Sequence, residues 1–157
     1  MTITTGIYNF LPIRNELSTS GQPTEDQLRA LASEDYNVII NLAFHDDPRY
    51  SLPNETQLVE ELGMVYVHIP VAFDNPTEDK LLDFFDTMDR HKGKKILVHC
   101  AANMRVTAFL GLYDTIKQHQ PEMQSFAPMK SIWQPDEIWS SFISQMIRKY
   151  TTSHAML

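Results

Sequence analysis

Apolar residues follow two different periods along the chain, and these periods predict strands and helices in turn. Short apolar runs without charged residues are typical of strands buried on both faces. Apolar residues that recur every three or four positions are typical of amphipathic helices. Strands are therefore expected over residues 38–42, 64–69 and 96–99, and helices over residues 24–33, 54–63, 77–91, from 106 to about 120, and after 135.

The segments between these elements are expected to be less regular. A short edge strand is predicted within residues 6–13, a turn-rich segment over residues 17–23, and an irregular stretch with Pro128 before the last helix. Thr24 and Gln27 have the spacing of a capping box, which predicts that a helix begins directly after Thr24.

The order of the elements predicts the fold class α/β. Strands that alternate with helices form a mostly parallel sheet covered on both faces. We therefore expect a three-layer fold with about four to five strands in its central sheet. A length of 157 residues suits a single domain, here residues 1–157. Because ligands bind at the carboxyl ends of the strands in such sheets, the loops after residues 42, 69 and 99 should meet at one edge.

One of these loops contains the only cysteine. The strand that ends at His99 is followed by Cys100 and then by Arg105, and the next helix is expected to begin at Val106. The N–H groups and the dipole at a helix start form an anion site, where a cysteine ionises more easily to the nucleophilic thiolate. Arginine offers a planar fork that matches two oxygens of a phosphate, sulfate or carboxylate. This stretch therefore combines a nucleophile, an anion cradle and a fixed cation.

The same stretch also has a plainer interpretation. A free cysteine is usually a small buried hydrophobe, and with six arginines in the chain, one can fall at this offset by composition alone. The strand before the loop and the helix after it favour the nucleophile. Residues 101–104 contain no glycine, although a cradle commonly needs a left-handed backbone position. Asn103 is the residue best suited to that position.

The segment from Val98 to Arg105, VHCAANMR, resembles the active-site loop of cysteine-dependent phosphatases of the tyrosine and dual-specificity type. In those phosphatases five residues separate His-Cys from Arg, whereas four intervene here. The shorter spacing resembles a bacterial phosphatase-like family that is often fused to metallo-β-lactamase-fold hydrolases and has loops such as HCASGNRV. The SGQP segment of that family is matched by residues 20–23, and its IPV and PT segments are matched by residues 69–71 and 76–77. The resemblance covers nearly the whole chain.

The resemblance implies a cysteine-phosphatase-like fold and a metal-independent hydrolase without a cofactor. Its activity would be the hydrolysis of phosphate monoesters, phosphotyrosine-type esters among them, through a cysteinyl-phosphate on Cys100. Asp74, in the loop after the second predicted strand, takes the position of the general acid that protonates the leaving group. His99 would hold carbonyl groups of the loop and support the Cys100 thiolate. Thr107 stands one residue after Val106, which occupies a position that usually carries Ser or Thr. The substrate-binding residues would be Ala101, Ala102, Asn103, Met104 and Arg105.

Other residues compete for the acid role. Asp74 itself also fits a solvated loop aspartate that makes an Asx turn. His45, Asp46 and Asp47, in the preceding loop, are rivals as proton donors. The same three residues could be imagined as metal ligands, but no His-x-x-x-His or Cys/His cluster joins them, so no metal site is expected.

Two further functions fit the same loop. The spacing of four residues between Cys100 and Arg105 resembles single-domain rhodanese-type sulfurtransferases, which would carry a persulfide on the cysteine. A non-enzymatic binding module, which keeps the anion pocket but turns substrate over poorly, would fit the missing glycine and Val106. Trp133 and Trp139 either cap the site or pack beneath it.

Composition narrows the expected setting and partners. The formal net charge of -7 argues against a nucleic-acid partner and repels anions at long range, so anion binding must come from the geometry around Arg105. No apolar run reaches the ~20 residues of a membrane span. A single cysteine excludes an intramolecular disulfide and fits a reducing, cytoplasmic location. The expected partner is a phosphate-bearing small molecule or a phosphoprotein, and the oligomeric state is left open.

Overall fold

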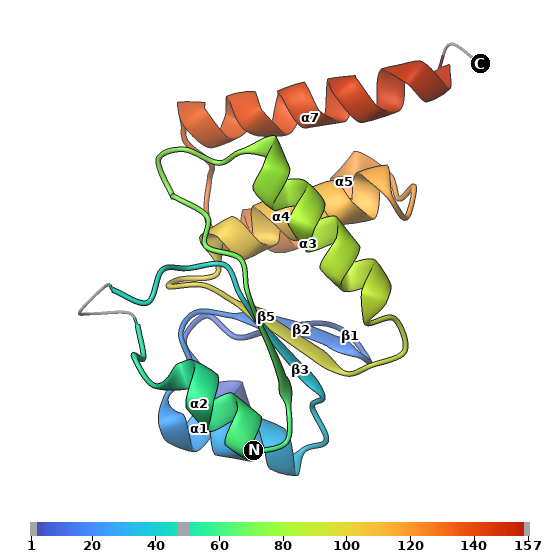
Figure 1. The fold of residues 1–157 in the computed structure, drawn as a ribbon. Coiled ribbons are helices and arrows are strands. Elements are labelled where there is room, and N and C mark those ends of the chain that lie inside the picture. The colour runs from blue at the N-terminus through green and yellow to red at the C-terminus, as the bar shows by residue number, and fades with distance from the viewer. Residues whose placement is uncertain (1–2, 47–50, 156–157) are drawn as a thin grey trace.

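A five-stranded sheet lies in the middle of the fold (Figure 1). The computed structural model describes residues 3–46 and 51–155. The strands are β1 (Leu11–Arg14), β2 (Leu17–Ser20), β3 (Val38–Asn41), β4 (Val65–His68) and β5 (Ile96–His99). Their order in the sheet is β1-β2-β5-β3-β4, and all neighbours are parallel except β1 and β2. β5 is therefore the middle strand.

Helices cover both faces of this sheet. They are η1 (Ile3–Gly6), α1 (Glu25–Ser33), α2 (Glu55–Glu61), α3 (Glu78–Arg90), α4 (Met104–Ile116), α5 (Glu122–Ser125), α6 (Ala127–Ile132) and α7 (Glu137–Ala155). Figure 1 shows α1 and α2 on one side of the sheet, α3, α4 and α5 on the other, and α7 as the helix farthest from it. This arrangement confirms the predicted three-layer α/β fold with a mostly parallel sheet. No helix within the described ranges is long and apolar enough to cross a membrane.

Polar side chains begin two of the helices where the sequence predicts. Thr24 and Gln27 form the capping box: the Thr24 hydroxyl accepts from the Gln27 N–H at 3.1 Å, and the Gln27 side chain accepts from the Thr24 N–H at 2.9 Å. The Thr77 hydroxyl accepts from the Lys80 N–H at 3.4 Å. These bonds satisfy N–H groups that a helix start leaves unpaired. They fix the starts of α1 and α3.

The segment predicted as turn-rich contains a strand instead. β2 pairs with both β1 and β5 and is buried along its whole length. Its serines and threonine concealed it from the hydrophobic pattern, because a buried strand usually reads as an apolar run. The hydroxyls are satisfied inside the fold instead; the Ser18 hydroxyl, for example, accepts from the Tyr36 hydroxyl at 2.9 Å. As a consequence, residues 20–23 lie beside the end of the central strand.

The stretch predicted as irregular after α4 forms the short helices α5 and α6. Pro128 lies in the first turn of α6. A helix leaves the N–H groups of its first turn without intrahelical partners, so proline is tolerated there. The proline that suggested a break therefore marks the beginning of a helix.

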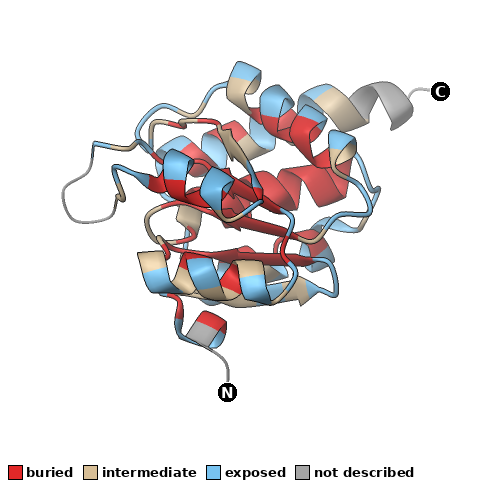
Figure 2. Ribbon diagram, turned by 60° about the horizontal axis from the view of Figure 1, so that its bottom comes forward, coloured by how far each residue is buried: buried red, intermediate tan, exposed pale blue. Residues whose placement is uncertain are grey.

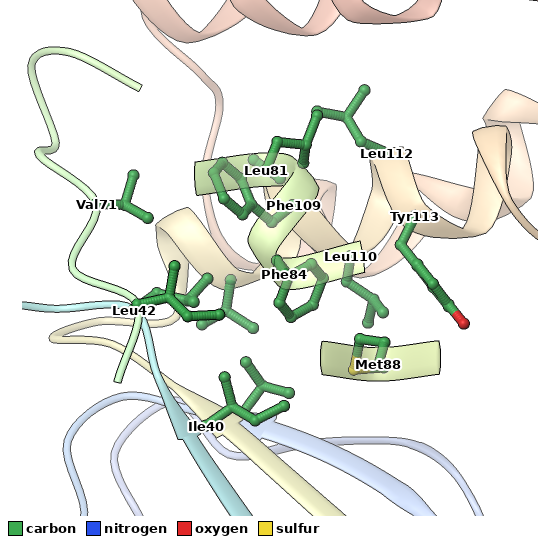
Figure 3. Packing of buried hydrophobic residues seen from close by; sticks show 14 of the residues in the cluster. Ile40, Leu42, Val71, Leu81, Phe84, Met88, Phe109, Leu110, Leu112 and Tyr113 are labelled. Carbon is green, nitrogen blue, oxygen red and sulfur yellow. The ribbon is translucent and has the colours of Figure 1, made fainter. Parts of the chain in front are cut away.

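Two hydrophobic clusters hold the layers together, one on each face of the sheet. Figure 3 shows the larger cluster, in which Ile40 of β3 and Leu42, directly after this strand, lie near Phe84 of α3 and Phe109 of α4. Residues 105–116 of α4 are all buried, and Figure 2 shows burial concentrated in the strands and in the helix faces packed on them. The helix that follows the cysteine loop is therefore a core element with little freedom to move.

Candidate active site

The central strand leads into the loop that contains the cysteine. β5 ends at His99, residues 100–103 form the loop, and α4 begins at Met104. The predicted strand, loop and helix are confirmed, but the helix begins two residues earlier than expected, so Arg105 lies in its first turn. The N–H groups of that turn have no intrahelical acceptor and can bind an anion. Cys100 is only 1% exposed and belongs to the larger hydrophobic cluster.

Asn103 adopts the left-handed conformation that the glycine-free loop requires, with φ of 67°. Its side-chain amide donates to the Asn9 carbonyl at 2.9 Å and to the Thr19 hydroxyl at 3.0 Å. Its carbonyl accepts from the Thr107 N–H, the first hydrogen bond of α4. Asn103 thus turns the chain, begins the helix and ties the loop to the N-terminal segment. The prediction that Asn103 supplies the left-handed position is confirmed.

The N-terminal segment holds the carbonyl groups of the loop. The Gln22 N–H donates to the Ala101 carbonyl at 3.1 Å, and the Asn9 side chain donates to the Ala102 carbonyl at 3.0 Å. Gly21 makes this approach possible, because a Cβ at that position would lie 2.6 Å from the Ala101 oxygen. The C=O and N–H of a trans peptide point in opposite directions. Holding the Ala101 carbonyl toward Gln22 therefore turns the Ala102 N–H away from this segment.

A buried glutamate lies behind the cysteine loop. Glu55 is the first residue of α2, and its Oε2 lies 2.5 Å from His99 Nε2, with both side chains fully buried. The Gln22 side chain donates to the other oxygen of Glu55 at 2.7 Å. His99 Nδ1 lies 3.4 Å from the Cys100 carbonyl. The glutamate therefore joins residues 20–23 to the histidine that precedes the cysteine.

The electrostatics of this pair favour the charged carboxylate. Burial disfavours the charged form of Glu55, but the interactions with His99, the hydrogen bond from Gln22 and the charge of His45 together outweigh burial, and the pKa of Glu55 lies below its ordinary value. Both partners of the His99 ring are acceptors, so an imidazolium with an N–H on each nitrogen would donate to both. No sequence pattern distinguishes Glu55, because an acidic residue in a first helical turn is common on solvated helices as well.

Arg105 is almost buried and contacts the loop that follows β4. Its Nη1 donates to the Val71 carbonyl at 2.8 Å, and its Cζ lies 6.0 Å from the centre of the Phe73 ring. The guanidinium has five N–H groups, so this bond leaves donors for an anion. The sheet edge thus brings the loop after β4 to the cysteine loop, as the predicted topology requires.

Asp74 lies in this second loop and is exposed to solvent. The loop makes a tight turn in which the Asn75 N–H donates to the Ala72 carbonyl at 3.1 Å. Asp74 directly follows Phe73, the residue whose ring faces Arg105. The structure therefore places the predicted acid in a loop that contacts the predicted anion-binding arginine.

Thr107 supports the start of α4. Its hydroxyl donates to the Asn103 carbonyl at 2.8 Å and accepts from the Trp133 indole N–H at 3.2 Å. The residue is 1% exposed. Thr107 therefore links the cysteine loop to the segment before α7.

The rival residues of the loop after β3 have different contacts. His45 Nε2 lies 2.7 Å from the Tyr66 hydroxyl, and the rings of His45 and His68 stack with centroids 4.0 Å apart. Burial lowers the pKa of His68. Asp46 is exposed, and Asp47 lies outside the described residues. Among the residues that are described, no three His, Cys, Asp or Glu side chains lie close enough together to hold a metal ion.

A cavity of about 520 Å³ opens beside the cysteine loop. Its wall includes Ala101, the residue after Cys100, and the half-exposed Tyr8. The lining residues are Tyr8, Gln22, Pro23, Thr24, Glu25, Ser51, Leu52 and Ala101. The lining within the described ranges includes one carboxylate, Glu25, and no lysine or arginine.

This fold, with a cysteine and an arginine at the start of the helix after the central strand, defines a class of phosphatase-like proteins. Residues 12–135 match the family model described as a DSP-PTPase phosphatase fused to NAD+ kinase. The chain belongs to this cysteine-dependent, dual-specificity phosphatase-like family. No curated protein sequence matches the chain.

Solved structures agree with this membership. A candidate phosphatase of the DUF442 group from Shewanella putrefaciens CN-32 is 35% identical, with 93% of this chain and 95% of that chain covered and a TM-score of 0.83. The core catalytic domain of the PP-IP phosphatase SIW14 from S. cerevisiae, in complex with citrate, is 16% identical, with 96% and 95% covered and a TM-score of 0.73. The second similarity shows the fold alone.

Proposed function

We propose that this protein is a phosphatase that hydrolyses phosphate monoesters through a cysteinyl-phosphate intermediate on Cys100. One observation carries the proposal: the only cysteine directly follows the central strand of a phosphatase-like fold, and Arg105 lies in the first turn of the helix after the loop. A helix start binds phosphate through its N–H groups. A thiolate in the same place is positioned to attack the phosphorus atom.

In the first step, the Cys100 thiolate forms an S–P bond while the P–O bond to the leaving group breaks. Arg105 and the N–H groups of residues 101–105 hold the other phosphate oxygens, where negative charge must be stabilised. A protonated Asp74 gives its proton to the leaving oxygen, which departs as an alcohol or phenol. His99, held by Glu55, lies directly before the nucleophile and supports the backbone of the loop through its contact with the Cys100 carbonyl.

In the second step, water attacks the phosphorus atom and the S–P bond breaks. The Asp74 carboxylate accepts a proton from the water, and inorganic phosphate leaves with the thiolate regenerated. The thiolate departs without the usual hydroxyl directly after the arginine, because Val106 occupies that position. The Thr107 hydroxyl is directed to the Asn103 carbonyl instead. We therefore expect this second step to be the slower one.

The cavity beside Ala101 supports a substrate with a single phosphate on an uncharged, apolar or aromatic group. A phosphotyrosine-type ester fits this description, either in a small molecule or in a phosphoprotein. The SIW14 domain is named for a PP-IP substrate, but the described lining of the cavity in this chain offers no basic residues for additional phosphates.

Steady-state assays of the wild type and Cys100→Ser test the proposal. We expect wild-type release of phosphate from 4-nitrophenyl phosphate and a loss of about 10³-fold or more in Cys100→Ser, because the nucleophile is removed. Transfer of sulfur from thiosulfate to cyanide, without phosphate release, would instead indicate a persulfide on Cys100 and a sulfurtransferase. No turnover in either assay, with phosphate still protecting Cys100 from iodoacetamide, would indicate an anion-binding module.

A further inference from the structure

The loop that contains Asp74 is attached to the last helix through one tryptophan. Trp139 of α7 is fully buried, and its indole N–H donates to the Phe73 carbonyl at 2.7 Å. The rings of Trp139 and Phe73 lie 6.0 Å apart. The backbone of the residue directly before Asp74 is thus fixed by a side chain that follows it by more than sixty residues.

The indole ring is itself held in place. Its centroid lies 5.9 Å from that of Phe109 in α4 and 6.0 Å from that of Phe142 in α7. Trp133 packs against it edge-on at 6.0 Å and also lies 5.6 Å from Phe73. Phe109, Phe142 and Trp133 belong to the larger hydrophobic cluster or pack against it. The core therefore fixes the indole ring of Trp139, and the indole ring fixes the Phe73 carbonyl in the loop.

The other side of the loop is fixed by the anion-binding arginine. Arg105 donates to the Val71 carbonyl at 2.8 Å, and the turn from Ala72 to Asn75 closes with a hydrogen bond of 3.1 Å. These two hydrogen bonds fix the backbone on either side of Phe73 and Asp74 but do not involve these two residues. Consecutive Cα atoms are about 3.8 Å apart, so the bond from Trp139 to Phe73 sets the starting point of the Asp74 side chain.

We propose that Trp139 is a positioning residue for the proton transfer from Asp74. This inference rests on the proposed function, since it requires that Asp74 act as the general acid. A general acid must lie within about 2.6–3.2 Å of the oxygen that it protonates. A misplacement of about 1 Å can lower the rate about 10²-fold. The two tryptophans therefore pack beneath the acid loop, and the ring of Phe73 packs against both of them.

Substrates with different leaving groups separate this role from a merely structural one. A phenolate with a pKa of about 10, as in tyrosine, needs a proton to leave, whereas 4-nitrophenolate leaves readily without one. Loss of acid positioning should therefore lower turnover of phenyl phosphate far more than turnover of 4-nitrophenyl phosphate. Loss of stability alone should lower both equally.

The experiment compares kcat/KM for these two esters in the wild type, Asp74→Asn, Trp139→Phe and Phe142→Leu. Phe142→Leu is the matched control, because it removes one ring that packs on Trp139 but leaves the hydrogen bond and the ring contact between Trp139 and Phe73 in place. We expect Trp139→Phe to lose about 10-fold on phenyl phosphate and no more than about 2-fold on 4-nitrophenyl phosphate, in the same sense as Asp74→Asn. Phe142→Leu should change both esters by the same factor.

Phe73→Leu decides the question if Trp139→Phe does not fold. Phe73 is 39% exposed, so its ring can be removed with little loss of core, and we expect the same selective loss on phenyl phosphate. Equal losses on both esters in Trp139→Phe or, where that variant is unfolded, in Phe73→Leu would overturn the role of Trp139. If Asp74→Asn still shows the selective loss, the proposed function stands. Turnover that survives Cys100→Ser would overturn the proposed function, and the inference with it.

Discussion

Among single residues, the Glu55–His99 pair is the least expected feature of the site. Two ionisable side chains are placed together in the core, 2.5 Å apart and without exposure. Such a pair is retained only when its geometry is good, and removing one partner commonly costs about 3–5 kcal/mol because the other charge is left buried. Gln22 completes the geometry by donating to the second oxygen of Glu55. The pair therefore makes the loop position depend on an ionised carboxylate.

This dependence predicts how stability changes with pH. The folded-state pKa of Glu55 lies below the ordinary value of 4.5. The ionised Glu55 therefore contributes to the free energy of unfolding above that value. This contribution is lost as the pH falls through the folded-state pKa, because the unfolded chain binds the proton at a higher pH than the folded chain. Glu55→Gln removes this contribution, so its free energy of unfolding should fall less steeply below about pH 4.5 than that of the wild type. Urea denaturation from pH 7 to pH 3.5 measures both slopes.

Glu60→Gln is the matched control for that comparison, because Glu60 lies on the same helix and is exposed. Its pH dependence should follow the wild type. If Glu55→Gln also follows the wild type, the pair does not contribute to folding in the way described.

Among the structural elements, the contact between residues 20–23 and the cysteine loop decides the shape of the cradle. β2 delivers these residues to the end of β5, where backbone meets backbone. Gly21 has no side chain, and an added Cβ would lie 2.6 Å from the Ala101 oxygen and 2.8 Å from the Tyr8 ring. Since one of these neighbours is the backbone of the loop itself, a larger residue must displace the loop.

Gly21→Ala should therefore lower phosphatase activity. Overpacking of this kind commonly costs about 1–3 kcal/mol of stability, and we expect kcat/KM to fall by at least about 10-fold, because a shift of about 1 Å in a catalytic loop has effects of that size or larger. Gly6→Ala is the control, since nothing lies within 4 Å of a Cβ at that position. Wild-type activity in folded Gly21→Ala would show that the loop does not depend on this contact.

At the scale of the whole molecule, the parallel sheet explains which parts of the site the sequence could predict. Hydrophobic periodicity identified the strands that end beside the site, so the loops containing Cys100 and Asp74 were expected to meet. The left-handed position of Asn103 followed from local backbone chemistry. These features depend on short stretches of sequence or on a general property of parallel sheets.

The remaining features depend on contacts between distant segments. Glu55 meets His99 across 44 positions, and Asn103 meets Asn9 across 94 positions. No hydrophobic periodicity indicates such pairs. The strand β2 could not be predicted, because its serines and threonine are residue types that are also typical of turns. The sequence alone could not show whether Trp139 caps the site or packs beneath it, because the answer depends on where α7 lies in the fold. The sequence therefore predicted the reacting groups better than the residues that hold them.

Mass spectrometry of the protein quenched in acid during turnover tests the central claim most directly. With 4-nitrophenyl phosphate in excess, the account predicts that the peptide containing Cys100 gains the mass of one phosphoryl group, since breakdown of the intermediate is expected to be the slower step. Cys100→Ser should show no turnover-linked modification that is released again as phosphate. An unmodified Cys100 during rapid wild-type turnover would contradict the account.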